Sequence, residues 1–489
     1  MEITQTAQYN DAIDIMTNGD SGATVRWSME ITNGDDVIVY PLWINHVFNR
    51  KDGVIGFADE LQVSFNIGAG AYTRKLLPFR DLLSVRLIRV DVETSESTED
   101  NLDFINFDLD IPEEAPDNEK RCEMVYTGII MDTGQNPSVA QGREDDGEDV
   151  LDLSAILEVR MQLFNPILEQ IKGIEIGGII RDSTIHDIIA NYFTMAKEEL
   201  NTDDKVVIEN INIAKINNSE PLSQVIIPHN LPVYELPRYL QQNYGVYSAG
   251  CGTYIDNTNW NVYPIYNTDK FDDAKQKVTV YIMPRKKFQF IEHTYKRNDD
   301  GSSSIVCTGE TGFKDDSGSQ YLKYGNGAKY VEVENLAEGA KSSNNKAIYS
   351  KATNSVSVTN ETRRNDVNIS KPSSSKITAN PYQVYTQLAS RSGNLLKFIW
   401  QSSCFDLIYV GQPIKVLYCD GDEIKSLIGV IAYIGHLSQN VSGAANDRWV
   451  NQSIVQAFVR EEELDNPSDK SEEELADEDI DSSVEDTIT

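Results

Sequence analysis

Short segments of alternating apolar and polar residues dominate the first third of the chain. Every second position is apolar at 63–67, 83–87, 104–109, 124–130 and 157–163. A side-chain period of two predicts β-strands with one buried and one wet face. The apolar stretch 37–40 predicts a further strand, which ends at Pro41 because proline has no N–H for a ladder. Short strands with polar connections favour a barrel or a sandwich.

The period changes to that of a helix in the middle of the chain. Asp182-Ser183 is typical of an N-cap, and apolar residues recur with helical spacing over 185–196. A second short helical pattern covers 236–240, and Gly245 stands where a left-handed C-cap is expected. An aromatic hairpin is predicted over 246–265.

Alternation returns in the last part of the chain, at 278–282, 396–400, 414–418 and 455–459, and 428–434 is dense in β-branched residues, which also favours a strand. Between these strands, the composition shifts to Ser, Asn, Lys, Thr and Gly with no sustained period. Such a composition predicts an extended polar insertion, with one weak strand at 330–333.

The predicted fold is α+β and mainly β, with two tube-like β-barrel domains around a central α+β domain. The predicted regions are a first β-barrel (1–150), the central α+β domain (151–277), a second β-barrel (278–311 and 375–460), a polar extended insertion (312–374) and an acidic C-terminal tail (461–489). A chain of 489 residues is long enough for about three domains.

The order of parts in the middle of the chain resembles the central domain of phage tail-hub proteins. These proteins are trimeric rings that join the tail tube to the puncturing spike in contractile tails and related injection machines. The resemblance lies in the helix 181–196, the lead-in with Ile227-Pro228 and Leu231-Pro232, the segment Leu240 to Tyr247 with its Tyr-Gly, and the hairpin after it. It covers roughly a fifth of the 489 residues.

The resemblance implies a structural hub of a phage tail baseplate in the virion, assembled in the host cytoplasm. It implies a homotrimer whose six β-domains match a six-fold tail tube and adapt it to a three-fold central spike. The implied partners are the spike protein, the tail tube proteins and the tape-measure protein. The implied role in genome ejection involves no enzyme activity and no catalytic, cofactor-binding or metal-binding residue.

The formal net charge of −34 argues against binding of DNA through its phosphates. Residues 461–489 hold fourteen acidic residues and a single lysine, Lys470. Such a segment is typical of an unstructured solubilising tail or of a peptide that lies on a basic partner. If the acidity extends into a ring's channel, DNA passes through it without specific binding.

The five cysteines form no CxxC and are predicted to be reduced and mostly buried: Cys122, Cys251, Cys307, Cys404 and Cys419. The N-terminus does not have the basic-then-apolar pattern of a secretory leader, and no apolar run is long enough to span a membrane.

Candidate chemistry is weak throughout the sequence. A glycosidase needs two carboxyls across a cleft, but with 77 acidic residues pairs such as Asp406 and Glu423 arise by chance. The histidines are isolated, with no HExxH and no cysteine at zinc-ligand spacing: His46, His186, His229, His293 and His436. His186 is predicted to be an ordinary surface or half-buried imidazole, and a Cys-His nucleophile has no local signature.

Other motifs are better explained as structure. Both GxG segments, 68–70 and 250–252, lack the third glycine of a dinucleotide fingerprint and predict turns or bulges. The acidic segment 145–149 lacks calcium-loop spacing. The basic clusters 285–287 and 363–364 are predicted to be solvated loops, with docking to an acidic neighbouring subunit as the alternative.

Two functional hypotheses of other classes remain beside the hub. A virion-associated cell-wall-degrading enzyme would need a cleft with paired carboxylates or a Cys-His pair. A DNA-encircling clamp would need basic helices facing inward, and the sequence has neither the basic stripe nor enough helix.

Overall fold

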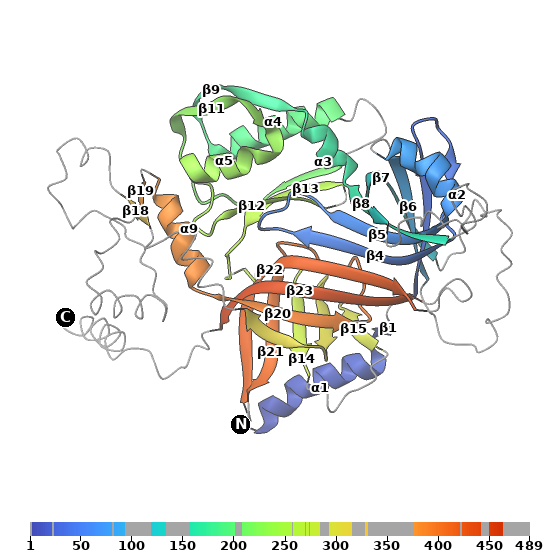
Figure 1. Cartoon of the computed structure of the whole chain (residues 1–489). Helices are drawn as coiled ribbons and strands as arrows, with labels where there is room; N and C mark the ends of the chain where they lie inside the picture. Colours follow the sequence, from blue (N-terminus) through green and yellow to red (C-terminus); the bar gives the residue numbers. More distant parts are fainter. Residues whose placement is uncertain are drawn as a thin grey trace, which may run out of the picture.

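The fold is taken from a computed structural model of the chain (Figure 1). The structure describes residues 2–21, 24–80, 83–92, 119–133, 156–200, 208–256, 258–268, 270–272, 274–283, 293–314, 328–330, 376–378, 380–420, 423–441 and 449–462. Most described strands belong to one sixteen-stranded sheet. The prediction of a mainly β fold is confirmed.

The first β body consists of seven strands hydrogen-bonded in the order β4-β5-β8-β7-β6-β2-β3. Their bounds are β2 (Thr24–Thr32), β3 (Ile38–Val39), β4 (Trp43–Asp52), β5 (Glu60–Gly68), β6 (Leu83–Val92), β7 (Glu119–Thr133) and β8 (Ile156–Phe164). After β5 the chain continues into α2 (Ala69–Ala71), η1 (Tyr72–Leu76) and η2 (Leu77–Phe79). The predicted alternation is confirmed on β5, where Val63, Phe65 and Ile67 are buried in one apolar cluster.

Strand β8 lies in the first β body and not in the α+β middle, where the sequence placed it. It pairs with β5 along its whole length and also with β7, and its residues Val159 and Leu163 are buried in the first cluster. Alternation identified β8 as a strand but carried no information about which strands it would join, because pairing is decided by long-range contacts.

The second β body consists of nine further strands of the same sheet. They are β1 (Asp20–Ser21), β14 (Val278–Ile282), β15 (His293–Arg297), β16 (Ser303–Cys307), β17 (Thr311–Lys314), β20 (Asn394–Gln401), β21 (Pro413–Asp420), β22 (Glu423–Asn440) and β23 (Trp449–Glu461). Strand β14 runs parallel to both β16 and β21, while β17 pairs with β20. The described ladders form an open path, so closure of either body into a barrel stays a prediction.

The hairpin β22–β23 belongs to both β bodies. The first half of β22 pairs with β21, from Glu423 to Val430, and its second half pairs with β4, from Tyr433 to Gln439. Strand β23 pairs with β22 throughout, with a bulge between Ile431 and Tyr433. This long hairpin therefore carries the ladder from one body into the other, as the orange strands beside blue β4 in Figure 1 illustrate.

The middle body covers the β bodies on one side (green in Figure 1). It consists of α3 (Pro166–Ile171), β9 (Glu175–Ser183), α4 (Ile185–Leu200), β10 (Asn210–Ile213), β11 (Leu222–Pro232), η5 (Val233–Glu235), α5 (Leu236–Asn243), β12 (Cys251–Asp256) and β13 (Asn259–Pro264). Strands β9 and β11 form a two-stranded sheet, and β10, β13 and β12 form a three-stranded sheet.

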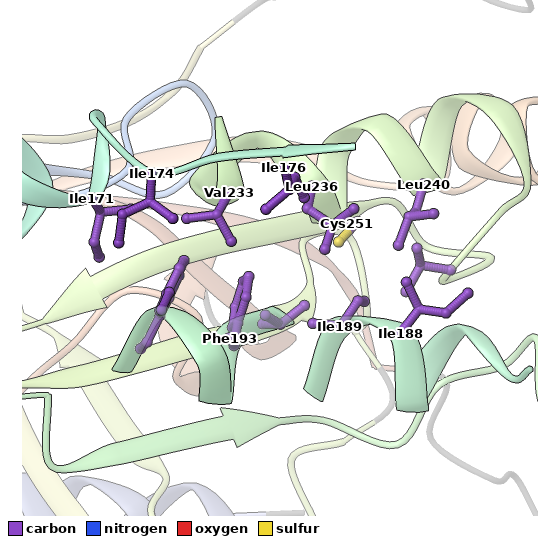
Figure 2. Packing of buried hydrophobic residues seen from close by; sticks show 14 of the residues in the cluster. Ile171, Ile174, Ile176, Ile188, Ile189, Phe193, Val233, Leu236, Leu240 and Cys251 are labelled. Carbon is purple, nitrogen blue, oxygen red and sulfur yellow. The ribbon is translucent and has the colours of Figure 1, made fainter. Parts of the chain in front are cut away.

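The core of the middle body lies between its helices and its three-stranded sheet. Figure 2 shows Ile188, Ile189 and Phe193 of α4 pointing toward side chains of η5 and α5. The ring of Phe193 also stacks on Trp260 of β13, with centroids 3.5 Å apart. Both rings are almost fully buried, so they contribute strongly to the cohesion of this core.

The two predicted helices of the middle body are present, with one change at a cap. Gly245 has φ +85° and its N–H donates to Leu240 O at 2.8 Å, which confirms the left-handed C-cap. The N-cap of α4 is Thr184 and not Asp182-Ser183, since Thr184 Oγ1 accepts from Asp187 N at 3.1 Å. Asp182 adopts φ +52° at the preceding turn, which moves the start of the helix.

Two helices lie inside ranges that the sequence assigned to the two β-barrels, 1–150 and 375–460. Helix α1 (Glu2–Asn18) packs on the second β body, where Ala12 and Ile15 join Tyr281, Val306 and others in a small apolar cluster. Helix α9 (Pro381–Arg391) contacts α5 of the middle body. Neither stretch alternates with a period of two, and each helix is stabilised by packing against elements distant in sequence.

Several predicted features fall outside the described residues: the strand 104–109, the acidic segment 145–149, both basic clusters, most of the insertion and the tail beyond 462. Of the insertion, the structure describes β18 (Ala328–Tyr330) and β19 (Lys376–Thr378) beside it, which pair in parallel. No helix in the described ranges has the length and apolarity needed to cross a bilayer.

Candidate functional site: a buried polar joint between the β bodies

The inward face of the β4–β22 ladder is polar, unlike the cores on either side of it. In register, Lys51 lies opposite Ile434, Asn49 opposite His436, and Val47 opposite Ser438. His436 and Ser438 are fully buried, and Lys51 and Asn49 are nearly so. We call the polar groups gathered here the polar joint. Buried polar groups need partners to offset their lost hydration, so their contacts define what the joint does.

Lys51 connects the first β body to the middle body. Its Nζ lies 2.6 Å from Asp256 Oδ1, at the turn between β12 and β13. Burial alone lowers the pKa of Lys51, but attraction by Asp256 and more weakly by Asp59 outweighs it and the pKa is raised. Lys51 is therefore a buried cation, held charged by the carboxylates around it.

Asp59 and Asn165 make a second link to the middle body. Asn165 Nδ2 donates to Asp59 Oδ1 at 2.6 Å, while Asn165 Oδ1 caps α3 by accepting from Ile167 N and Leu168 N at 2.9 and 3.2 Å. Burial raises the pKa of Asp59, and the attraction of Lys51 opposes this rise only in part. One asparagine thus fixes the start of α3 and ties it to the first β body.

Arg238 on α5 provides a third attachment of the middle body. Its guanidinium donates to Ile55 O and Gly56 O at 3.1 and 2.6 Å, in the turn between β4 and β5. The same group lies 3.7 Å from the centre of the Phe57 ring. Burial lowers the pKa of Arg238. Planar stacking combined with two carbonyl acceptors suits a guanidinium and not an ammonium.

Arg89 joins the first β body to the second. It forms an ion pair with Asp406, which lies in the segment between β20 and β21. The Arg89 guanidinium carbon is also 5.4 Å from the centre of the Phe405 ring, and that ring lies 4.6 Å from the ring of His436. Arg89, Phe405 and His436 thus lie one beside the next and connect β6 with β22.

His436 is held neutral within a chain of hydroxyl groups. Its Nδ1 is 2.5 Å from Ser453 Oγ, which in turn donates to Ser403 Oγ at 2.6 Å. Burial, helped by the neighbouring cation Lys51, lowers the pKa of His436 to about 3. The imidazole is therefore uncharged near neutral pH and acts as a hydrogen-bonding group.

A parallel set of contacts ties the tip of the β22–β23 hairpin to the first β body. Ser438 Oγ donates to Asn451 Oδ1 at 2.7 Å and accepts from Trp27 Nε1 of β2 at 3.0 Å. Together with the ion pairs, these bonds fix the orientation of three bodies around one point. The described arrangement is suited to holding bodies in register, since its ion pairs Lys51–Asp256 and Arg89–Asp406 each join elements of two different bodies.

The candidate residues named from the sequence are spread over the structure and do not form one site. Asp406 is part of the polar joint, while Glu423 begins β22 and pairs in register with Asp420. Of the isolated histidines, only His436 lies in the joint. His186 is an exposed imidazole whose Nδ1 is 3.7 Å from Asp187 Oδ1, as predicted.

The other motifs also have structural roles. Gly68 ends β5, and Gly250 has φ +73° just before β12, where the chain turns. Of the five cysteines, Cys251 and Cys307 are buried, while Cys122 and Cys404 are half-buried and Cys419 is exposed, so the prediction that most are buried is wrong. No group of three or more His, Cys, Asp or Glu in the described ranges is placed to hold a metal ion. The absence of catalytic and cofactor-binding residues stays a prediction.

The residues of the joint that sequence analysis missed share one weak signal. Asn49 and Lys51 occupy inward positions of a strand whose other inward residues, such as Val47, are apolar. A polar residue at an inward position needs a partner, but the sequence does not say which one. Arg89, Asp256 and Asp59 carry no such signal.

Comparisons with known proteins find distant similarity in solved structures only. No protein-family model matches the chain, and no curated protein matches its sequence. Solved structures with a similar chain course include a tail protein from Neisseria meningitidis MC58, which is 8% identical with a TM-score of 0.43 over 88% of this chain and 96% of that chain. The 43 kDa tail protein of prophage MuSo2 from Shewanella oneidensis is 7% identical with a TM-score of 0.43, over 88% and 98% of the two chains.

A third similar structure is the E. coli c3393 protein, a component of the type VI secretion system described as structurally similar to the T4 bacteriophage tail proteins gp27 and gp5. It is 11% identical with a TM-score of 0.35, over 85% of this chain and 73% of that chain. The neighbours are thus tail proteins of phages and of a type VI secretion system. At TM-scores below 0.5, no property of theirs is transferred to this chain.

Proposed function

We propose that the chain is a structural hub of a phage tail baseplate or of a related injection machine. Three copies form a ring that adapts a six-fold tail tube to a three-fold central spike and lines the DNA channel. Its partners are the spike, the tail tube proteins and the tape-measure protein, in a virion assembled in the host cytoplasm. The chain performs no bond-making chemistry in this role.

The observation that carries the proposal is the ladder shared by the two β bodies. Strand β22 pairs with β21 and then with β4, so that two strand-built bodies stand side by side within one continuous sheet. A chain that supplies two adjoining β segments gives six segments in a closed ring of three copies. The buried polar joint supports this role, because hydrogen bonds and ion pairs with defined geometry hold the two segments at a fixed angle.

The charge of the chain supports passage of DNA without binding. A net charge of −34 repels phosphate, and the described lysines and arginines of the joint are paired with carboxylates or carbonyls. An acidic channel surface follows if this charge extends to the ring's inner side. A lumen lined by lysine and arginine would contradict this part of the proposal.

The alternative of a virion-associated cell-wall-degrading enzyme has no specific support among the described residues. Asp406, one of its candidate carboxylates, is engaged by Arg89. The other, Glu423, lies at the start of β22 and pairs in register with Asp420. An ion-paired carboxylate is held in its charged form, which does not suit the general acid of a glycosidase.

The oligomeric state of the full-length chain tests the proposal. Native mass spectrometry should give a species of three times 54.9 kDa, either for the chain alone or after addition of the spike protein. A chain that stays monomeric under both conditions contradicts the ring. Peptidoglycan zymography run in parallel should show no clearing, and clearing would establish the enzyme instead.

A further inference from the structure

A groove of about 480 Å³ lies where the middle body meets the second β body. One wall is the outward face of β10 and β13, with Asn212, Asn261 and Tyr263, and the other is the segment Tyr409–Gly411 before β21. The groove lies outside the polar joint, and none of the joint's ion pairs lines it. A groove of this size fits a ligand of a few sugar or amino-acid units.

The outward face of β10 and β13 consists of paired asparagines. In the parallel register, Asn210 lies beside Asn259 and Asn212 beside Asn261. In each pair the β10 residue donates from Nδ2 to Oδ1 of its partner at 2.9 Å. The alternate residues, including Trp260 and Val262, are buried in the middle core. Asparagine is disfavoured in strands. Its presence at all four outward positions therefore indicates that the function of this face, and not the stability of the strands, selects asparagine there.

The lining of the groove is polar but uncharged. Among the described residues that line it there is no Asp, Glu, Lys, Arg or His, although a quarter of the chain's residues are charged. Such a lining gives no counter-charge to an ionic ligand, and it lies on a strongly acidic protein that repels anions. The ligand chemistry that fits is therefore neutral and rich in hydrogen-bonding groups.

The amides and the tyrosine rings match two different features of a sugar. Each asparagine amide has an acceptor oxygen and two N–H donors. The cross-strand bond uses one donor of Asn212 and the oxygen of Asn261, and Asn261 Nδ2 also donates to Asn259 O. The oxygen of Asn212 and one N–H of each amide therefore remain for hydroxyl groups of a ligand. The ring of Tyr409 is half-buried on the opposite wall and provides an apolar surface for the C–H face of a pyranose. Gly411 also lines this wall and has φ +88°. It has no side chain to fill the groove at this position.

We propose that this amide-lined groove binds an uncharged oligosaccharide. The asparagine pair Asn212–Asn261 hydrogen-bonds its hydroxyl or acetamido groups, and Tyr409 contacts its ring faces. Neutral glycans of this kind occur as hexose chains on cell surfaces and as N-acetylhexosamine chains in cell walls. The amides and the tyrosine ring of the groove could bind either kind by the same contacts. The assignment does not depend on the ring proposed above, since it concerns a groove within one chain.

Isothermal titration calorimetry of the full-length chain tests the assignment. The probes are a neutral hexose oligomer, an N-acetylhexosamine oligomer, an oligogalacturonate as the anionic arm, and an uncharged extended peptide as the arm for another ligand class. We expect binding of at least one neutral oligosaccharide at millimolar concentration or below and none of the anionic arm. The preferred neutral arm distinguishes the two sources. Absence of heat with both neutral oligosaccharides, equal binding of the anion, or binding of the peptide alone overturns the proposal.

Variants locate the binding. Asn212→Leu and Asn261→Leu should each weaken binding about tenfold, the effect of losing one or two hydrogen bonds to the ligand. Asn394→Leu, at an exposed position that begins β20, is the matched control and should bind as the parent does. Because the leucines could disturb the sheet, hydrogen exchange of the unaltered chain provides a second measurement. Saturating oligosaccharide should slow exchange in 208–214 and 408–412, and unchanged exchange there contradicts the assignment.

Discussion

Asn49 of β4 and His436 of β22 face each other in the ladder that joins the two β bodies, and both present a buried acceptor atom that no described residue satisfies. Ser453 Oγ donates its proton to Ser403, so His436 Nδ1 carries the proton shared with Ser453. His436 Nε2 then carries no proton and can only accept a hydrogen bond. Asn49 Oδ1, which is also an acceptor, belongs to the residue opposite His436 in the ladder. Two facing acceptors contribute nothing to each other.

Asn49→Val should therefore be nearly neutral or slightly stabilising, within about 1 kcal/mol, because it removes an unpaired acceptor and adds a strand-forming residue. The matched control is Asn45→Val on the same strand, since Asn45 donates to Ser64 and accepts from Asn66. The control should lose about 1–2 kcal/mol. Urea unfolding of both variants measures the difference. A larger loss for Asn49 than for Asn45 would show that Asn49 has a donor after all.

Lys51→Met should be strongly destabilising, by about 3–5 kcal/mol, because it leaves Asp256 and Asp59 in the joint without their cation. Lys51→Met combined with Asp256→Leu should recover part of that loss. Lys172→Met, which breaks the exposed pair with Glu169, should change stability by less than about 0.5 kcal/mol. The shift of the urea midpoint distinguishes the variants. Equal effects of the two single lysine variants would contradict the structural role of the joint.

Acid should weaken the fold through His436. The pKa of His436 is about 3 in the folded chain, against 6.5 for an ordinary histidine, so only the unfolded chain binds this proton between those values. The free energy of unfolding therefore falls as the pH drops from 6.5 toward 3, by on the order of a few kcal/mol. Asp59 works in the opposite direction, since its pKa is raised on folding.

His436→Gln, which stays neutral and can still donate to Ser453, should flatten this decline between pH 6.5 and about pH 4. The measurement is the thermal midpoint of both proteins across that range. His186→Gln alters an exposed ring and serves as the control. Parallel pH profiles for His436→Gln and the parent would refute the assignment of the decline to this histidine.

Arg238→Ala should loosen the attachment of α5 to the turn between β4 and β5. The change removes two hydrogen bonds to carbonyls and the stacking on Phe57, worth about 2–3 kcal/mol together. Arg238→Lys should rescue only a minor part, because an ammonium lacks the planar fork. Hydrogen exchange of residues 53–58 reports the effect. Unchanged exchange in the alanine variant would contradict the attachment.

Gly245→Ala should cost more than Gly301→Ala, although both glycines have φ near +85°. A Cβ at 245 would lie 2.2 Å from Tyr382 Cδ2 on α9, whereas a Cβ at 301 would meet only Lys275 O at 3.6 Å. Both variants carry the backbone strain of about 1 kcal/mol, and the first adds a clash between α5 and α9. Thermal unfolding measures both. Equal losses would mean that α9 moves aside freely.

Local pattern was sufficient to identify several of the longer strands and two of the helices of this protein. The alternation of Val63, Phe65 and Ile67 located β5, and the glycine at 245 ended α5, because each depends on a few neighbouring residues. Helix α1 was missed because its sequence lacks a strong periodic contrast between apolar and polar residues, and α9 because polar residues such as Gln383 and Thr386 contact α5 of the middle body. Both helices are stabilised by packing against elements that are distant in the sequence.

The polar joint lay beyond the reach of sequence analysis. Lys51 and Asp256 are 205 positions apart, and Arg89 and Asp406 are 317 apart, so no spacing rule connects them. The chain's own order of residues determined several strands, the C-cap at Gly245 and the acidic balance, because these follow from local geometry and from counting charges. Only the folded arrangement decided which strands pair and which buried charges meet. The strand pairings and ion pairs of the folded chain lower the free-energy cost of burying polar groups. They depend on contacts across the whole molecule, so no single segment of the sequence specifies them.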